Sequence, residues 1–235
     1  MREVPADDYS RSLDETRAHA GEVTFLWRTY RWMAIGLALT GAVAWLVAST
    51  PSLLQAVFAN SLLFYGAIIA ELVMVVVFAA RASRMSFAAA ATTFTAYAAL
   101  NGVTMATIFL FYTAASVAQV FFVCAGAFAG LSLYGAKTRR DLTAMGHFMF
   151  IGLVGLVLAS VVNLFLKNPA IYWVTTYAGV LIFAGLTAYD NQKLRRMYAL
   201  QGEGGNLALQ GALALYLDFV NLFLQLLRLF GKRRR

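Results

Sequence analysis

The chain has 235 residues, 61% of them apolar, with 19 basic and 11 acidic side chains and a formal net charge of +8. This composition excludes intrinsic disorder, which requires low hydrophobicity, and argues against a soluble globule, which keeps a charged surface over its core. A single cysteine, Cys124, excludes a disulfide framework and a cysteine-built zinc site. The sequence therefore predicts a polytopic membrane protein.

The chain divides into a polar N-terminal tail (1–31), a transmembrane domain (32–231) and a basic tail (232–235). The N-terminal tail lacks the short apolar stretch and small-residue cleavage site of a signal peptide, so we expect the first apolar segment to be a retained anchor. A spanning helix needs roughly 20 mostly apolar residues, whereas membrane strands alternate over about 10. We predict an all-α integral membrane protein with seven transmembrane helices, at about 32–49, 58–80, 87–111, 115–136, 144–166, 170–189 and 207–230.

Basic residues near the predicted helix ends favour one orientation. Only Lys167 lies in the loops of one side, whereas ten lie on the other side: Arg28, Arg31, Arg81, Arg84, Lys137, Arg139, Arg140, Lys193, Arg195 and Arg196. Because Lys and Arg are enriched on the cytoplasmic side, we expect a cytoplasmic N-terminus. The tail 232–235 contradicts this pattern if the seventh helix crosses fully. Either tails escape the rule or that helix does not cross.

Three acids fall inside predicted membrane helices, where an ionisable group costs at least about 2.5 kcal/mol on the insertion scale and is a functional candidate. Asp190 and Asp218 lie 14 residues before and after Gly204. If the sixth helix continues through Leu194 and Met197, an antiparallel hairpin places both carboxyl groups at one depth. Two facing carboxyl groups would share a proton. The third acid, Glu71, is as consistent with helix packing as with an ion path.

The seventh predicted helix carries a polar stripe on an apolar background. Asp218, Asn221, Gln225 and Arg228 follow each other at intervals of three, four and three residues, which is one face of a helix. Such a stripe belongs inside a bundle or along a watery path, so Asn221 and Gln225 are candidates for an ion path or for helix pairing. Asp190, followed by polar neighbours, also fits an ordinary interfacial acid in contact with solvent.

Other motifs favour neither an enzyme nor a nucleic-acid binder. Ser132 lacks the second glycine of a serine-hydrolase motif, so we expect no enzymatic activity. The net positive charge lies mainly in loops and tail, which favours anionic lipid over nucleic acid. Gly126 and Gly130, and likewise Gly152 and Gly155, have the spacing of close helix contacts.

Three segments resemble the Bax-inhibitor family (transmembrane Bax inhibitor motif), in particular its bacterial, YccA-like branch. The resemblance covers about residues 25–231 and is carried by Phe25–Tyr30 with Gly36–Gly41, by Leu186–Gln192, and above all by Gly211–Gly231. It implies a seven-helix bundle with the last helix central, in the inner membrane. It also implies a pH-sensitive calcium leak, with Asp190 and Asp218 as pH sensor and candidate calcium ligands. An acid and an arginine of the second helix, Glu71 and Arg81, would assist.

Two classes of function therefore stay open. One is a pH-sensitive calcium (cation) leak channel, with calcium as the transported ion and no cofactor. The other is a membrane interaction protein that modulates a membrane-bound protease or another partner, as the resemblance suggests for some bacterial relatives. A channel needs a water-accessible acidic path, whereas an interaction protein needs none of its acids to face water.

Overall fold

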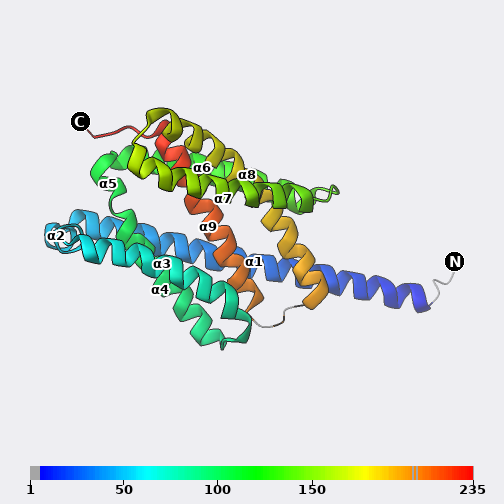
Figure 1. The fold of residues 1–235 in the computed structure, drawn as a ribbon. Helices are drawn as coiled ribbons and strands as arrows, with labels where there is room; N and C mark the ends of the chain where they lie inside the picture. Colours follow the sequence, from blue (N-terminus) through cyan, green and yellow to red (C-terminus); the bar gives the residue numbers. More distant parts are fainter. Residues whose placement is uncertain (1–5, 203, 205, 235) are drawn as a thin grey trace.

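The computed structural model describes residues 6–202, 204 and 206–234, and within these ranges the chain is helical without a β-strand (Figure 1). The described residues form nine α-helices and one 3₁₀ turn: α1 (Ala6–Ser49), α2 (Pro51–Phe58), α3 (Ser61–Arg81), η1 (Ala82–Arg84), α4 (Phe87–Met105), α5 (Ile108–Phe111), α6 (Ala114–Lys137), α7 (Thr143–Leu166), α8 (Pro169–Gln201) and α9 (Leu207–Phe230). Seven of the described segments are long and apolar enough to cross a membrane, which confirms the predicted fold class.

The helix ends follow local signals in the sequence. Asn60, Ser86, Thr113 and Asn168 cap α3, α4, α6 and α8, each accepting a backbone N–H bond at the first turn. Pro51 follows the end of α1, because the residue before a proline disfavours the helical conformation. The predicted third segment, 87–111, is broken into α4 and α5 at residues 106–107.

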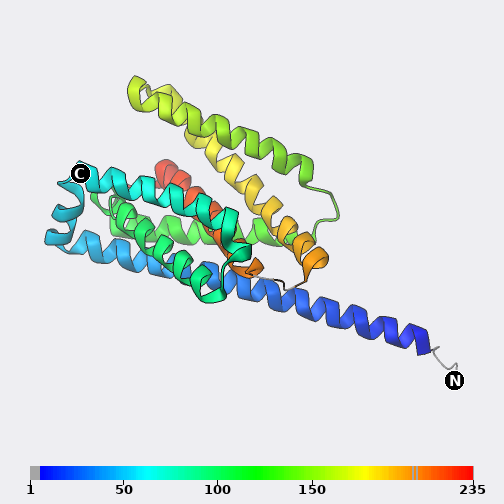
Figure 2. The same ribbon diagram turned by 60° about the horizontal axis from the view of Figure 1, so that its bottom comes forward.

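Two helices are longer than the predicted membrane segments. α1 begins at Ala6, so the boundary expected at residue 31 falls within one continuous helix, while residues 1–5 lie outside the described ranges. Figures 1 and 2 show this N-terminal part of α1 projecting beyond the other helices. α8 likewise continues past residue 189 to Gln201. The hairpin expected from the continuation of the sixth helix is therefore present.

The last helix lies at the centre of the bundle. α9 packs against α1, α4, α6 and α8, and 15 of its 24 residues are buried. Close approach to α9 uses small residues, because a Cβ at Gly211 would meet Leu194 and one at Gly179 would meet Gln225. The prediction of close helix contacts at the two glycine pairs was wrong at three of the four positions, because Gly126, Gly130 and Gly155 have open space beside them.

By contrast, α3 and α7 lie on the outside, with Phe78 the one buried residue of α3 and Gly146 and Leu156 those of α7. Such apolar exposed helices face lipid. On α1, Trp27 and Trp45 are 72% and 55% exposed and lie 18 residues apart, about 27 Å along a helix. That length matches the roughly 30 Å hydrocarbon core, at whose boundaries tryptophans gather.

The C-terminal tail lies at the end of the bundle opposite to the N-terminus (Figure 1). The backbone N–H of Thr113 donates to the Lys232 carbonyl oxygen at 3.1 Å, and the N–H of Arg234 donates to that of Phe111 at 2.9 Å. Since these contacts join the tail to the α5–α6 turn, α9 runs the full length of the bundle. The alternative of an incomplete seventh crossing does not fit this arrangement.

Candidate functional site

Two aspartates from neighbouring helices meet inside the bundle. Asp190 of α8 is partly buried and Asp218 of α9 is only 5% exposed. The α8–α9 hairpin brings their carboxyl groups close enough to interact directly. The equal spacing from Gly204 predicted that the two side chains lie at one depth, and the structure places them together.

Contact between these two carboxyl groups has a chemical requirement. An ionised carboxylate only accepts hydrogen bonds, so a bond between Asp190 and Asp218 needs a proton on one of them. The Oδ2 atom of Asp218 is buried and has no hydrogen-bond partner among the described residues. The positive charge of Lys193, one turn beyond Asp190, acts on both carboxyl groups. The arrangement suits a pair that holds one proton and can release it.

A cavity of about 180 Å³ reaches Asp190 from the N-terminal side of the bundle. We call it the inner cavity. It lies between α3, α8 and α9, and its lining includes Phe78, Asp190, Lys193 and Ala214. This volume exceeds the roughly 10–15 Å³ that one water needs by the same measure, so water can approach Asp190 from this side.

Glu71 lies in a second polar site, surrounded by neutral donors. Its carboxyl oxygens accept hydrogen bonds from Asn101 Nδ2 at 3.1 Å and from Thr104 Oγ1 at 2.7 Å. The Tyr216 hydroxyl donates to Asn101 Oδ1 at 2.9 Å and lies 2.6 Å from the Thr40 Oγ1 atom. These bonds connect α3, α4, α9 and α1, so Glu71 is anchored by a hydrogen-bonded network that does not include the aspartates.

A larger cavity of about 430 Å³, the outer cavity, opens beside this network. Its lining includes Glu71, Asn101, Leu217 and Asn221. On α9, Ala214 lines the inner cavity whereas Leu217 and Asn221 line the outer one. Asp218 directly follows Leu217 on α9 but lines neither cavity.

The remaining candidates of the second and seventh helices are dispersed. Asn221 faces the outer cavity and donates to the Leu217 carbonyl oxygen at 2.8 Å. Gln225 instead is buried against Gly179 and accepts a weak bond from Arg228 at 3.4 Å. Arg81 lies exposed at the end of α3, ten residues or about 15 Å along the helix from Glu71. The structure thus does not bring Arg81 to Glu71.

The described residues contain no group of three or more His, Cys, Asp or Glu side chains able to hold a metal ion. Asp190 and Asp218 are therefore two carboxyl ligands without a third. Calcium takes six to eight oxygen ligands at its protein sites. Two carboxyl groups alone do not supply such a ligand set.

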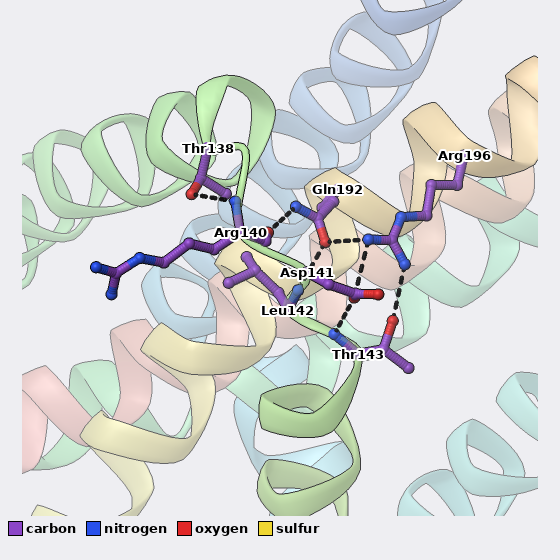
Figure 3. A network of polar contacts seen from close by, with 7 residues as sticks. All are labelled: Thr138, Arg140, Asp141, Leu142, Thr143, Gln192 and Arg196. Atoms are coloured by element: carbon purple, nitrogen blue, oxygen red, sulfur yellow. Dashed lines mark hydrogen bonds and ion pairs between the residues drawn. The ribbon is translucent and has the colours of Figure 1, made fainter.

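Residues after Asp190 fasten α8 to the α6–α7 loop (Figure 3). The Gln192 side chain accepts from the Leu142 N–H at 2.9 Å and donates to the Arg140 carbonyl oxygen at 2.8 Å. Arg196 forms an ion pair with Asp141 at 2.8 Å. The loop between α6 and α7 is thereby tied to the same helix that carries Asp190.

Asp141, outside the membrane segments, is stabilised as an anion. Hydrogen bonds from Thr143, and a further one from Arg196, lower the pKa of the exposed Asp141 carboxyl. At neutral pH the ionised carboxylate therefore stabilises the attachment of the α6–α7 loop to α8. Because this acid already has an ion-pair partner in solvent, it offers a contrast to the buried pair.

Sequence reasoning missed the polar residues that support these acids. Asn191, beside Asp190, is 1% exposed and not solvated. Its side chain donates to Ser132 Oγ at 3.1 Å and to the Thr187 carbonyl oxygen at 2.7 Å, and accepts from the Tyr30 hydroxyl. On α4, the three-residue interval between Asn101 and Thr104 was the available signal of a polar face.

Comparison with known proteins agrees with this architecture. Residues 22–235 match the family model described as Bax1-I, inhibitor of apoptosis-promoting Bax1. The chain belongs to the Bax inhibitor family. The inner membrane protein YbhL of Escherichia coli K12 is 45% identical over 233 residues, covering 97% of this chain and all of the relative. A protein of Deinococcus radiodurans is 43% identical over 227 residues, with 95% and 94% of the two chains covered.

A membrane protein of Streptococcus pyogenes serotype M3 is 38% identical over 221 residues, covering 92% of this chain and 96% of its own. The family resemblance read from the sequence is thus confirmed. Together with seven helices able to cross a bilayer, the inner-membrane relative identifies this Bax-inhibitor family member as a multi-pass inner membrane protein.

Proposed function

We propose that this protein is a pH-sensitive calcium leak channel in which Asp190 and Asp218 form the pH sensor and gate. The observation that carries the proposal is the contact of these two carboxyl groups beside the inner cavity, on a hairpin whose second helix, α9, also lines the outer cavity. The function is transport, so no residue is assigned a catalytic role. Calcium is the transported ion and no cofactor is required.

The proposed gate is the α8–α9 hairpin. A shared proton holds the two carboxyl groups together and keeps the inner and outer cavities apart. Its loss leaves two negative charges in contact, which repel strongly where the effective dielectric constant is low. Separation of α8 and α9 would then join the cavities, a two-state element whose balance depends on pH. Glu71, in the outer cavity, would attract the cation toward the gate.

Calcium flux into liposomes containing the purified protein tests the proposal. We expect flux that depends on pH between about 6 and 8, where a carboxyl pair sharing a proton titrates. The matched control is Asp141→Asn, which removes an exposed acid and leaves the buried pair intact. Flux no greater than that of protein-free liposomes at every pH would refute the channel.

The alternative is an interaction protein that modulates a membrane-bound protease or another membrane partner. Its distinguishing feature is that the outer cavity need not contain water. In a Cys124→Ala background, Asn221→Cys should react with a water-soluble thiol reagent if the cavity is part of an ion path. Gln225→Cys, buried one helical turn further along α9, is the matched control and should not react. An unreactive Asn221→Cys in the folded protein would favour the interaction protein.

We also propose a cytoplasmic N-terminus, from the ten-to-one bias of basic residues near the helix ends. A reporter fused before Arg28 or within 137–141 should be cytoplasmic, and a periplasmic signal from either site would overturn the orientation. The tail 232–234, which lies at the opposite end of the bundle, is then periplasmic.

A further inference from the structure

The end of the bundle opposite to the N-terminus carries positive charge without acidic side chains. It is built from the α1–α3 connection, the α5–α6 turn, the α7–α8 loop and the C-terminal tail. Residues 50–60, 106–116, 160–175 and 225–234 contain no Asp or Glu. They contain five cationic residues: Lys167, Arg228, Lys232, Arg233 and Arg234.

The tail is held in place by several hydrogen bonds. Besides the two backbone bonds to the α5–α6 turn, the Lys232 N–H donates to Ser116 Oγ at 2.7 Å. The Arg234 guanidinium donates to the Phe109 carbonyl oxygen at 3.0 Å. Between these two residues, Arg233 forms an antiparallel bridge with Tyr112. Its side chain therefore extends from an anchored backbone.

A pocket of about 550 Å³ lies between this tail, the α7–α8 loop and the last turn of α9. Lys167, Arg228 and Arg233 all line it. Lys167 ends α7 in the left-handed conformation, with φ of 50°, a geometry that glycine adopts at lower cost. Three cations from three separate segments thus meet around one space.

Aromatic residues form another part of the pocket wall. Tyr172 and Trp173, near the start of α8, both line it, and the Arg228 guanidinium lies 5.8 Å from the centre of the Tyr172 ring. Trp173 is 44% exposed. Tyrosine and tryptophan at the end of a spanning helix mark the depth of the lipid headgroups.

Cations at the other end of the bundle have different surroundings. There Arg195 forms an ion pair with Glu22, and Arg196 pairs with Asp141. Around the tail pocket, within the described part of the chain, no carboxylate is available to Lys167, Arg228 or Arg233. Three neighbouring cations repel each other, so an anion that enters the pocket relieves this repulsion.

We propose that Lys167, Arg228 and Arg233 form a phosphate-binding site, occupied by the headgroup of an anionic phospholipid. Guanidinium groups bind phosphate oxygens through paired hydrogen bonds, and lysine adds a point charge. Basic pockets between membrane helices bind anionic headgroups by the same chemistry. The aromatic wall at headgroup depth favours phosphate presented by lipid, while a soluble phosphate would use the same cations.

Native mass spectrometry of the purified protein with added phosphatidylglycerol or phosphatidylcholine tests this site. The variant replaces all three cations, as Lys167→Gln, Arg228→Gln and Arg233→Gln. The matched control removes three exposed cations at the other end, as Arg84→Gln, Lys137→Gln and Arg139→Gln. We expect the first variant to lose about a hundredfold in phosphatidylglycerol affinity, and the control to change little.

A further arm adds inorganic phosphate in excess over the bound lipid. Bound phosphatidylglycerol that resists this competition supports the lipid as source, whereas displacement supports the site with a soluble phosphate as its ligand. Arg233→Gln alone, on the exposed tail, keeps the test decisive if the triple variant does not fold, with an expected loss of about fivefold. Equal affinity for the two lipids, or equal phosphatidylglycerol affinity in the tail-pocket and control variants, would overturn the proposal.

Discussion

The two acidic sites of the bundle differ in the groups that contact their carboxyl oxygens. Glu71 is surrounded by neutral donors, Asn101 and Thr104, which satisfy a carboxylate without any proton. Asp190 and Asp218 contact each other, and one Asp218 oxygen has no other partner among the described residues. In the first arrangement neutral donors satisfy the carboxyl oxygens, whereas in the second the contact between two carboxyl groups requires a shared proton. The two acidic sites therefore differ in the immediate partners of their carboxyl groups.

The largest expected effect comes from removing one member of the aspartate pair. Asp190→Asn or Asp218→Asn keeps a hydrogen-bonding amide but leaves one carboxyl group, so the pair can no longer change its charge repulsion by losing a proton. Calcium flux in liposomes should then vary less than about twofold between pH 6 and 8. The double variant should add little, because the two side chains act as one unit.

A strong pH response that persists in both single variants would mean that the pH sensor lies elsewhere, and that the aspartate pair does not differ from Glu71 in this respect. Thermal unfolding of each variant is the control for folding.

A smaller effect is expected at Glu71, and it concerns the size of the flux and not its pH dependence. Glu71→Gln removes one negative charge and keeps the shape of the side chain, so attraction for a divalent ion in the outer cavity weakens. Flux should fall several-fold at all pH values, with the same pH profile. Unchanged flux in the folded variant would indicate that Glu71 serves helix packing. An altered pH profile of flux would indicate that Glu71 is part of the pH sensor.

The support of Glu71 can be weakened without touching its charge. Tyr216→Phe removes the hydroxyl that bonds Asn101 and lies beside Thr40, and it should lower the free energy of unfolding by about 1 kcal/mol. Tyr97→Phe is the control, since Tyr97 lines the same cavity and its hydroxyl lies outside this hydrogen-bond chain. Thermal unfolding in detergent compares the two, and equal losses would argue against the network.

The smallest effect belongs to Asp141, an exposed acid that serves as reference. Its pKa is lowered in the folded protein, so its contribution is present above the usual pKa of about 3.9 and is lost as the pH falls. Hydrogen exchange of the 138–143 amides should show protection that decreases below about pH 4 in the wild type. In Asp141→Asn this protection should be lower by a few-fold and independent of pH. Calcium flux should not change.

The sequence predicts the depth of a residue along a helix hairpin, but it does not predict how each helix is rotated about its axis. Asp190 and Asp218 were placed together because residues equally far from a hairpin turn lie at equal depth. The contact of Glu71 with Asn101 was not predictable in this way, since it depends on how α3 and α4 are rotated about their axes. The glycine pairs show the same limit, because Gly126 and Gly130 occupy a suitable pattern on a face that meets no neighbour.

The seven membrane segments were predicted closely, because length and hydropathy determine whether a helix can cross. The sequence boundary at residue 31 was less informative, since the change from polar to apolar residues marks where α1 enters the membrane and not where it begins. The assisting role of Arg81 was expected from the resemblance alone. Arg81 is exposed and lies ten residues after Glu71. Because a helix rises about 1.5 Å for each residue, the two residues are about 15 Å apart along α3.

The central position of α9 has a consequence for biosynthesis. Proteins are made from the N-terminus, so α1 to α8 leave the ribosome before α9 does. Until α9 arrives, the surfaces of α1, α4, α6 and α8 that it covers have no partner from this chain. The bundle is therefore assembled around a groove that is filled last, and the bonds from the 232–234 tail to the α5–α6 turn form only after that step. Completion of the transmembrane core therefore follows the synthesis of α9.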